Sequence, residues 1–338
     1  MFRTKVTDLL GIQYPIVGGT MMWITTPEFT AAVSEAGGLG TLASFNYPTK
    51  REFREAIDLV RNATDKPFAV NVNLFPAQRP VNADEYLDVI LEKKIRIVET
   101  SGGKVNEEWG KRFKEAGITW IHKCVGVRYA RKAERLGADI ITVVGFENGG
   151  ATGTLDLGTL VLVPSVVDGV RVPVIGGGGV SDGRGLAALL SLGAQGVIIG
   201  TRLLLTKEAP IHPGLKEALL KASELDTQLI LRSLGRTHRV WSNSAASECI
   251  SLEKAHADES QIIKAASGDR SRVMYRDGNV DLGVLPCGQG IGLARDIPTV
   301  KELFDRIIEE AGRIVMGLVQ SNSARCEKGS RSTDSYFR

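Results

Sequence analysis

The sequence predicts a parallel α/β fold closed into an eight-stranded barrel, and three observations lead to that prediction. Short apolar runs alternate with helical stretches eight times over roughly the first 225 of the 338 residues. Most of these runs are apolar throughout, as expected of parallel strands buried on both faces. The last two runs end in glycine turns, and barrels of this kind typically hold phosphate after strands seven and eight.

The first four units each join a short strand to a helix with recognisable ends. Thr26 precedes a proline at the first turn of one helix, and Thr49 with Glu52 forms a capping box at the start of the next. The expected strands are Pro15–Thr20, Leu39–Phe45, Phe68–Leu74 and Ile95–Gly102. The expected helices are Thr26–Gly37, Thr49–Thr64, Asn82–Lys94 and Asn106–Gly117.

The second four units continue the alternation and set the strand count. Eight units in this length match the typical size of a (β/α)8 TIM barrel, about 250 residues, better than an open doubly wound sheet with fewer strands. The expected strands are Thr119–Cys124, Asp139–Phe146, Val172–Ile175 and Val197–Ile199. The first two of these precede helices at Val127–Gly137 and Leu157–Val170, and helical stretches also follow the last two.

The pattern changes from about Asp226, where helical periodicity continues without glycine-ended strands. We therefore expect residues 226–294 to form a mainly helical appendage over the barrel mouth, acting as a substrate and lid region. Residues 1–225 and 295–320 would form the barrel domain, with an amphipathic helix at Lys301–Val315 packing back on it. The polar, Ser- and Arg-rich residues 321–338 are expected to form a disordered tail.

Composition excludes several classes of protein. The net charge is +3, from 42 basic and 39 acidic residues, and no basic stripe is interleaved with aromatics, so a nucleic-acid partner is not expected. No run of 18 apolar residues and no signal-peptide pattern occurs, which predicts a cytoplasmic chain without a membrane partner. The cysteines lack metal-ligand spacing to the histidines, so no metal site is expected. They are Cys124, Cys249, Cys287 and Cys326.

Polar residues at the expected strand ends form a set typical of a cofactor site. The set contains neither a carboxylate pair nor a metal cluster, but the glycines after strand seven and the Gly-Thr pair after strand eight form a phosphate cradle. A small-molecule substrate is therefore the expected partner. The cradle consists of Gly177, Gly178, Gly179, Gly200 and Thr201.

Seven motifs in this order resemble the nitronate monooxygenase family, once called nitropropane dioxygenases. Relatives of that family include FMN-dependent NADH:quinone reductases and flavin-containing enoyl-ACP reductases. The resemblance runs from Phe2 to about Val315, and LFPAQRP is most similar to the quinone-reductase branch. The motifs are PIVGGTMMW, AVNVNLFPAQRP, IHKC, GFENGG, GGGGVSDGRG, IIGTRLL and DLGVLPCGQGIG.

The resemblance implies FMN as the cofactor and NADH or NADPH as a co-substrate. It places Thr20, Met21 and Met22 under the isoalloxazine ring, and Asn73 at its polar edge. Lys123 would lie near the pyrimidine end, where a fixed cation stabilises the anionic reduced flavin. Gly149 would approach the ring by its backbone, and the cradle would hold the phosphate.

The chain departs from the family after its sixth strand. Family members carry a histidine directly after the glycine pair, in a pattern like ExxGHxG, and here that position is Ala151. A methyl group neither takes nor gives a proton, which leaves Lys123 and Thr152 as weak catalytic candidates. Hydride transfer from a nicotinamide to FMN depends on alignment more than on a base, so a reductase reaction is the leading expectation.

Several alternatives stay open at the level of sequence. The leading hypothesis is NAD(P)H-dependent reduction of a quinone or another electron-poor acceptor. Nitronate oxidation with O2, a flavin enoyl reductase or dehydrogenase activity, and a flavin-binding protein without catalysis are the others. Lys123 could instead form a barrel-end salt bridge, and Glu147 and Asn148 could bind substrate or cap the next segment. The oligomeric state is open, with a homodimer as one option.

Overall fold

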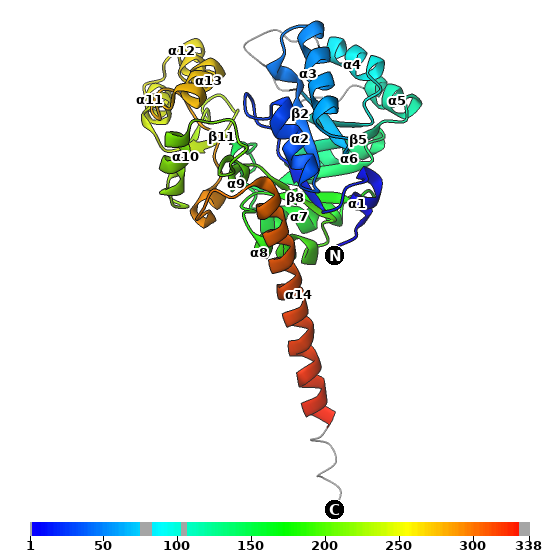
Figure 1. Ribbon diagram of the computed structural model, residues 1–338. Helices are drawn as coiled ribbons and strands as arrows, with labels where there is room; N and C mark the ends of the chain where they lie inside the picture. The colour runs from blue at the N-terminus through cyan, green and yellow to red at the C-terminus, as the bar shows by residue number, and fades with distance from the viewer. Residues whose placement is uncertain (1, 75–82, 103–106, 331–338) are drawn as a thin grey trace, which may run out of the picture.

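The computed structural model describes residues 2–74, 83–102 and 107–330, and its centre is an eight-stranded parallel sheet. The strand order is β1-β9-β8-β6-β5-β4-β3-β2, and an isolated parallel bridge from Val17 to Leu39 brings β1 beside β2. The sheet is therefore nearly closed, and the predicted TIM barrel is confirmed (Figure 1). The strands are β1 Ile16–Gly18, β2 Gly40–Ala43, β3 Phe68–Asn73, β4 Ile97–Ser101, β5 Thr119–Cys124, β6 Ile140–Val144, β8 Val174–Gly177 and β9 Gly196–Ile199.

Helices connect the strands, and their starts follow the predicted caps. The Thr26 side chain accepts from Phe29 N, and Thr49 with Glu52 forms the reciprocal capping box. Observed helices are one to a few residues shorter than predicted, because end residues adopt cap conformations. The helices are α1 Lys5–Leu10, α2 Pro27–Glu35, α3 Lys50–Ala63, α4 Ala83–Glu92, α5 Glu107–Glu115, α6 Val127–Arg135, α7 Thr159–Val167, α8 Gly183–Ser191 and α9 Thr201–Leu204.

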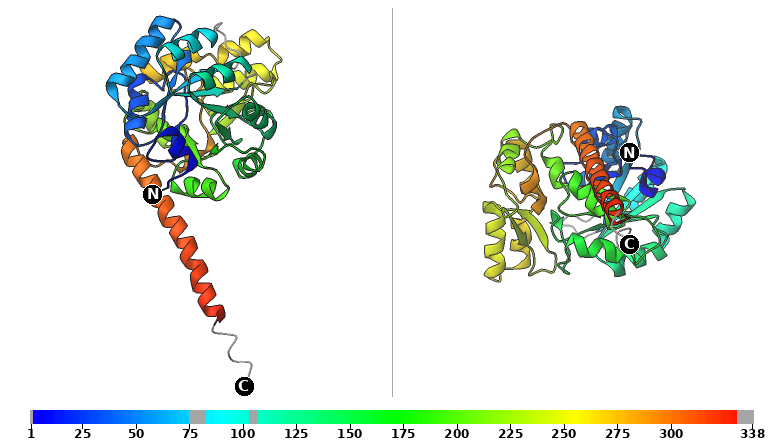
Figure 2. Two further views of the ribbon diagram at one scale, coloured as in Figure 1. Left: turned by 90° about the vertical axis from the view of Figure 1, so that its right-hand side faces the viewer. Right: turned by 90° about the horizontal axis from the view of Figure 1, so that it is seen from below.

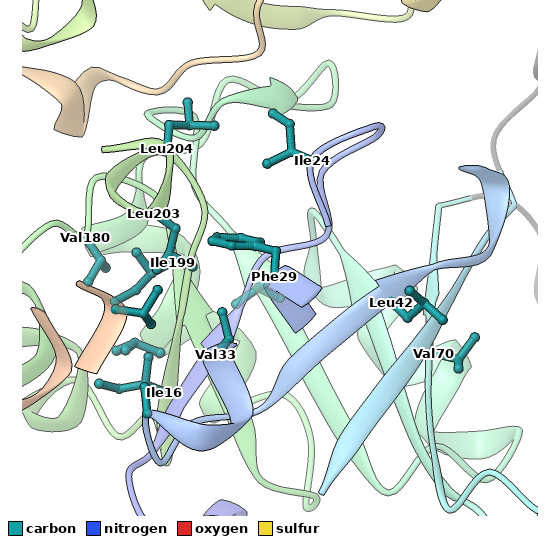
Figure 3. Packing of buried hydrophobic residues seen from close by; sticks show 14 of the residues in the cluster. Ile16, Ile24, Phe29, Val33, Leu42, Val70, Val180, Ile199, Leu203 and Leu204 are labelled. Atoms are coloured by element: carbon teal, nitrogen blue, oxygen red, sulfur yellow. The ribbon is translucent and has the colours of Figure 1, made fainter. Parts of the chain in front are cut away.

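Two apolar cores lie on the two sides of the barrel wall. Between strands and helices, Ile16 and Ile199 pack with Phe29 and Val33 of α2 and with Leu203 of α9, as Figure 3 shows. The smaller core fills the lower barrel interior, where α1 contributes side chains below the strands. It includes Val6, Leu10, Val17, Ala69, Ile97, Ile121, Ile140, Ile175 and Ile198.

The appendage contains a small antiparallel sheet that the sequence did not predict. Its strand order is β10-β11-β7, and β7 belongs to the loop after barrel strand β6. The remaining appendage elements gather with this sheet on one side of the barrel (Figures 1 and 2). The elements are β7 Gly150–Ala151, α10 Pro213–Leu220, β10 Thr227–Ile230, β11 His238–Trp241, α11 Ser244–Lys254, α12 Glu259–Ala265, α13 Gly268–Asp277 and the 3₁₀ turn η2 Gln289–Leu293.

The C-terminal helix α14, Val300–Ser330, packs its first half on α8. The predicted helix Lys301–Val315 is confirmed, and α14 continues into the segment 321–338 that the sequence predicts to be a disordered tail. Figures 1 and 2 show its second half extending away from the barrel. Residues 331–338 lie outside the described residues, as does nearly all of LFPAQRP. Across the described ranges, no helix is long and apolar enough to cross a membrane.

The contact between α8 and α14 leaves no room for a side chain at Gly183. A Cβ there would lie 2.5 Å from Ala311 N and 2.7 Å from Ile307 O. Gly183→Ala must therefore push the two helices apart, and we expect it to lower the free energy of unfolding by about 1–3 kcal/mol. Urea denaturation followed by circular dichroism measures this.

Gly312→Ala is the matched control, because a Cβ at Gly312 meets no described atom within 4 Å. Alanine has a higher helix propensity than glycine, so this variant should gain up to about 1 kcal/mol. Equal stabilities for Gly183→Ala and Gly312→Ala would contradict the close packing of α8 on α14.

Candidate functional site

The carboxyl ends of all eight barrel strands meet at one face, and the predicted site residues lie there in two groups. The order β6-β8-β9-β1 places the cradle glycines beside the loop that begins with Thr20. The order β3-β4-β5 places Asn73 level with Ser101 and Ser101 level with Lys123. The fold thus brings the predicted residues to a single face, as expected of a TIM barrel.

The cradle positions are occupied by glycine for two different structural reasons. A Cβ at Gly177 would lie 2.4 Å from Ile198 Cγ2, and one at Gly178 would lie 2.5 Å from Thr159 Oγ1. Gly178 also has a φ of +102°. These two glycines are therefore required by the packing of the chain itself.

Gly179 and Gly200 instead leave space at the surface of the cradle. Among described atoms, the nearest to a Cβ at Gly179 is Glu147 Cβ at 3.8 Å, and the nearest at Gly200 is Met21 Sδ at 4.0 Å. Thr201 begins α9, and the first N–H groups of a helix have no intrahelical partner. Open space beside such donors fits the phosphate of FMN.

The segment Cys287–Leu293 crosses the same strand ends and was not assigned a role from sequence. Gly288 N donates to Thr201 Oγ1 at 2.8 Å, and Gln289 N donates to Glu147 O at 2.9 Å. A Cβ at Gly149 would lie 2.7 Å from Gly288 N, so this glycine is needed for the approach of the segment. The predicted approach of Gly149 to a flavin stays a prediction. The run of glycines in DLGVLPCGQGIG was the available signal for this close packing.

Inside the upper barrel, three side chains converge on one carboxylate that sequence reasoning missed. Glu99 on β4 is 1% exposed, and its Oε1 accepts from Asn71 Nδ2 at 2.6 Å and from Thr20 Oγ1 at 3.0 Å. Lys123 Nζ lies 3.1 Å from the same oxygen. The salt bridge considered for Lys123 is therefore present. The signal was strand alternation, because Asn71, Glu99 and Lys123 all occupy inward positions of neighbouring strands.

His122 lies on the opposite face of β5, as alternation predicts. It is buried, and its Nδ1 lies 2.9 Å from Thr100 Oγ1, which also accepts from Trp120 Nε1. Burial lowers the pKa of His122 to about 4, with Glu99 acting against that shift and Lys123 reinforcing it. His122 is therefore a neutral structural residue behind the barrel wall.

The buried cysteines are equally inert. Burial raises the pKa of Cys124 to about 12 and raises the pKa of Cys287 as well. Neither thiol supplies a thiolate nucleophile near neutral pH.

Glu147 and Asn148 hold the loop after β6. Both Glu147 carboxylate oxygens accept from Thr159 N, at 3.1 and 3.0 Å, so Glu147 caps the start of α7. Asn148 Nδ2 donates to Ala151 O at 3.2 Å. Glu147 therefore takes the capping role, whereas Asn148 bonds within its own loop, and substrate binding by either residue stays a prediction. Thr152, a weak catalytic candidate, is buried, and its N–H donates to Thr237 O at 3.1 Å.

Ala151 has a histidine directly across from it. In the β7–β11 pair, Ala151 is level with His238, and such pairs carry their side chains on the same face. His238 Nδ1 lies 2.7 Å from Arg236 O, and since a carbonyl only accepts, Nδ1 carries the hydrogen. Nε2 is then the basic nitrogen of the neutral ring. Burial lowers the pKa of His238, while the hydrogen bond to Arg236 O acts against this.

The loop after β1 joins the site to the appendage. Met21 is half-buried and Met22 is exposed, and a Cβ at Gly268 would lie 2.2 Å from Met22 Cε. The Arg272 guanidinium stacks over the Trp23 ring at 4.6 Å. The start of α13 therefore packs directly on this loop. Asn73 is half-buried at the end of β3. In the part of the chain that the structure describes, no group of three metal-ligating side chains occurs.

Comparisons with known proteins agree with this geometry. The family model described as nitronate monooxygenase matches residues 3–85 and 77–310. The chain is 33% identical to "(3aS,4S,5R,7aS)-5-hydroxy-7a-methyl-1-oxo-octahydro-1H-indene-4-carboxyl-CoA dehydrogenase" of Rhodococcus jostii RHA1, over 91% of this chain and 96% of that one.

Two solved structures are similar over nearly their whole length. FabK from Thermotoga maritima is 36% identical with a TM-score of 0.88, covering 95% of this chain and 100% of that one. A nitroalkane oxidase from Streptomyces ansochromogenes is 27% identical with a TM-score of 0.80, covering 92% and 99%.

The open space at Gly200 allows a test of the cradle that leaves the core untouched. Gly200→Val places a branched side chain where the phosphate is expected, and its Cβ would lie no closer than 4.0 Å to the nearest described atom beyond its chain neighbours, Met21 Sδ. We expect FMN affinity to fall about 10- to 100-fold, since each lost charge-assisted hydrogen bond is worth about 1.5–3 kcal/mol. Fluorescence titration of the apoprotein with FMN measures this.

Gly178→Ala is the contrasting variant, because its Cβ would clash with Thr159 Oγ1 and Gly145 N. It should lower thermal stability, whereas Gly200→Val should not. Unchanged FMN affinity in Gly200→Val would show that the phosphate does not bind in this cradle.

Proposed function

Because this chain belongs to the nitronate monooxygenase family of flavin-dependent oxidoreductases, we propose that it transfers hydride between a nicotinamide and an electron-poor organic acceptor through bound FMN. The cofactor supplies the two-electron chemistry when bound. The chain binds it, orients it and sets the charge around it. The expected acceptors are quinones and thioester-conjugated carbonyl compounds.

The arrangement of the strand ends supports an FMN site. Gly179, Gly200 and the start of α9 would hold the phosphate by backbone donors, at the end of the site nearest the appendage segment Cys287–Leu293. Met21 Sδ lies 4.0 Å from the position of a Cβ at Gly200, beside the cradle, and Met21 would pack under the ring. Asn73 ends β3 and Lys123 lies near the end of β5, on the other side of β4, and both would contact the polar edge of the ring.

The choice of hydride transfer over nitronate oxidation rests on position 151, which has no acidic or basic side chain. The residue after the glycine pair is Ala151, and the Thr152 hydroxyl donates to carbonyl groups of its own sheet. Hydride transfer from the nicotinamide to FMN requires alignment of donor and acceptor rather than a proton-transferring side chain, and the proton that the reduced acceptor takes up would come from solvent. The identity to a carboxyl-CoA dehydrogenase supports including CoA thioesters beside quinones among the substrates that exchange hydride with the flavin.

Anaerobic mixing of the FMN-loaded protein with NADH or NADPH tests this proposal. We expect bleaching of the flavin absorbance with at least one nicotinamide, followed by reoxidation with a quinone or an α,β-unsaturated acyl-CoA. The same protein stripped of FMN is the control and should oxidise neither nicotinamide. An FMN-loaded protein inert to both nicotinamides would refute the proposal and leave a flavin-binding role.

Nitronate oxidation is the second candidate, favoured by the position of His238 across from Ala151. With Nδ1 bonded to Arg236 O, the Nε2 atom would accept a proton on the side where the family places its histidine. Oxygen uptake with propionate 3-nitronate tests this. If His238 is the base, His238→Asn should lower the rate at least about 100-fold, the usual contribution of general-base catalysis.

Ala151→His separates the two candidates. A wild-type protein that uses His238 should gain little from a second imidazole, whereas a protein without a base should gain nitronate oxidation only in this variant. Wild-type activity that is unchanged in His238→Asn would exclude His238 as the base.

A further inference from the structure

The strongest unassigned feature is the convergence of three donors on a single oxygen of Glu99. The donors come from the β1 loop, β3 and β5: Thr20 Oγ1, Asn71 Nδ2 and Lys123 Nζ, all within 3.1 Å of Oε1. The two charged partners differ in exposure, since the Glu99 side chain is 1% exposed and that of Lys123 is 20% exposed. Lys123 therefore lies between the buried carboxylate and the face where the strands end.

The other oxygen of Glu99 is buried and, within the described ranges, has no hydrogen-bond partner. Thr142 Oγ1 is also buried without a partner there, on the strand position level with Lys123. Burying an unpaired carboxylate costs folding free energy, and the ion pair with Lys123 offsets that cost for Glu99. The pair contributes close to zero net charge at this end of the barrel.

Both Thr20 and Lys123 are residues that would contact the flavin, and Glu99 fixes the polar atom of each. We propose that Glu99 is a positioning residue that orients Thr20 and Lys123 toward FMN and lowers the reduction potential of the bound cofactor by neutralising Lys123. This inference rests on the proposed function, since it requires FMN at the strand ends. Glu99 itself lies one layer below and acts through its partners.

The direction of the effect follows from electrostatics. Two-electron reduction of FMN adds negative charge at the pyrimidine end of the ring, which a nearby cation stabilises. Glu99 opposes that stabilisation because its charge lies 3.1 Å from the ammonium group. Removing the Glu99 charge should therefore raise the potential, and removing the Lys123 charge should lower it.

Three variants test the inference through the midpoint potential of the bound FMN, measured by dye-equilibration titration. Glu99→Gln keeps the shape and an accepting oxygen, and we expect an upward shift of at least about 30 mV, equal to a tenfold change in the two-electron equilibrium. Lys123→Met should shift the potential downward. The double variant should return close to wild type, because the two charge changes cancel. A merely structural role predicts no such opposite and cancelling shifts.

Glu208→Gln is the matched control, because this carboxylate accepts from Val300 N away from the strand ends. It should leave the potential unchanged. If Glu99→Gln alone does not fold, the double variant compared with Lys123→Met gives the same measurement, with the double variant expected at the higher potential.

The outcomes separate this inference from the proposed function. A wild-type protein that binds no FMN would refute the proposed function itself. FMN-loaded variants in which loss of the Glu99 charge leaves the potential unchanged or lower would overturn the role of Glu99 and leave the proposed function intact.

Discussion

The approach of two backbones at Gly149 and Gly288 is the constraint on which the site depends. A Cβ on Gly149 would lie 2.7 Å from Gly288 N, and one on Gly288 would lie 2.6 Å from Glu147 O. With this contact in place, Gly288 N donates to Thr201 Oγ1, and Ser181 Oγ donates to Gly290 O. The appendage is thereby joined to the ends of three barrel strands, and its sheet takes in β7 from the loop after β6.

The barrel was predictable because its signals are local. Each strand is a short apolar run, each helix has a cap or a glycine end, and the caps at Thr26 and Thr49 form as their sequences predict. The appendage strands were missed because β10 and β11 have sequences TQLI and HRVW, without an apolar run. β11 also pairs with β7, whose two residues are too few to predict a strand. Such pairing is set by the fold rather than by local propensity.

The site was predictable only in part, for a related reason. Glycines after β8 and β9 identify the cradle, but the sequence does not distinguish Gly178, required by packing against Thr159, from Gly200, which leaves open space. Glu99 was missed because a single acidic residue in an apolar strand has no meaning until the register places it level with Asn71. Which side chains form hydrogen bonds between strands depends on the strand register in the closed barrel. The pattern of residues along the sequence does not specify that register.

The barrel interior and the loop after β6 favour the same class of chemistry. The Glu99–Lys123 pair carries close to zero net charge, and the Ala151 side chain has no group that transfers a proton. These residues therefore offer a substrate neither a net charge nor a proton. A reaction that first removes a proton needs a base beside the substrate, and position 151 supplies none. Hydride transfer moves two electrons and a proton together. Its rate depends on the distance and angle between the atom that donates the hydride and the atom that accepts it. A site that fixes geometry through backbone contacts and keeps its internal charge balanced is suited to that demand.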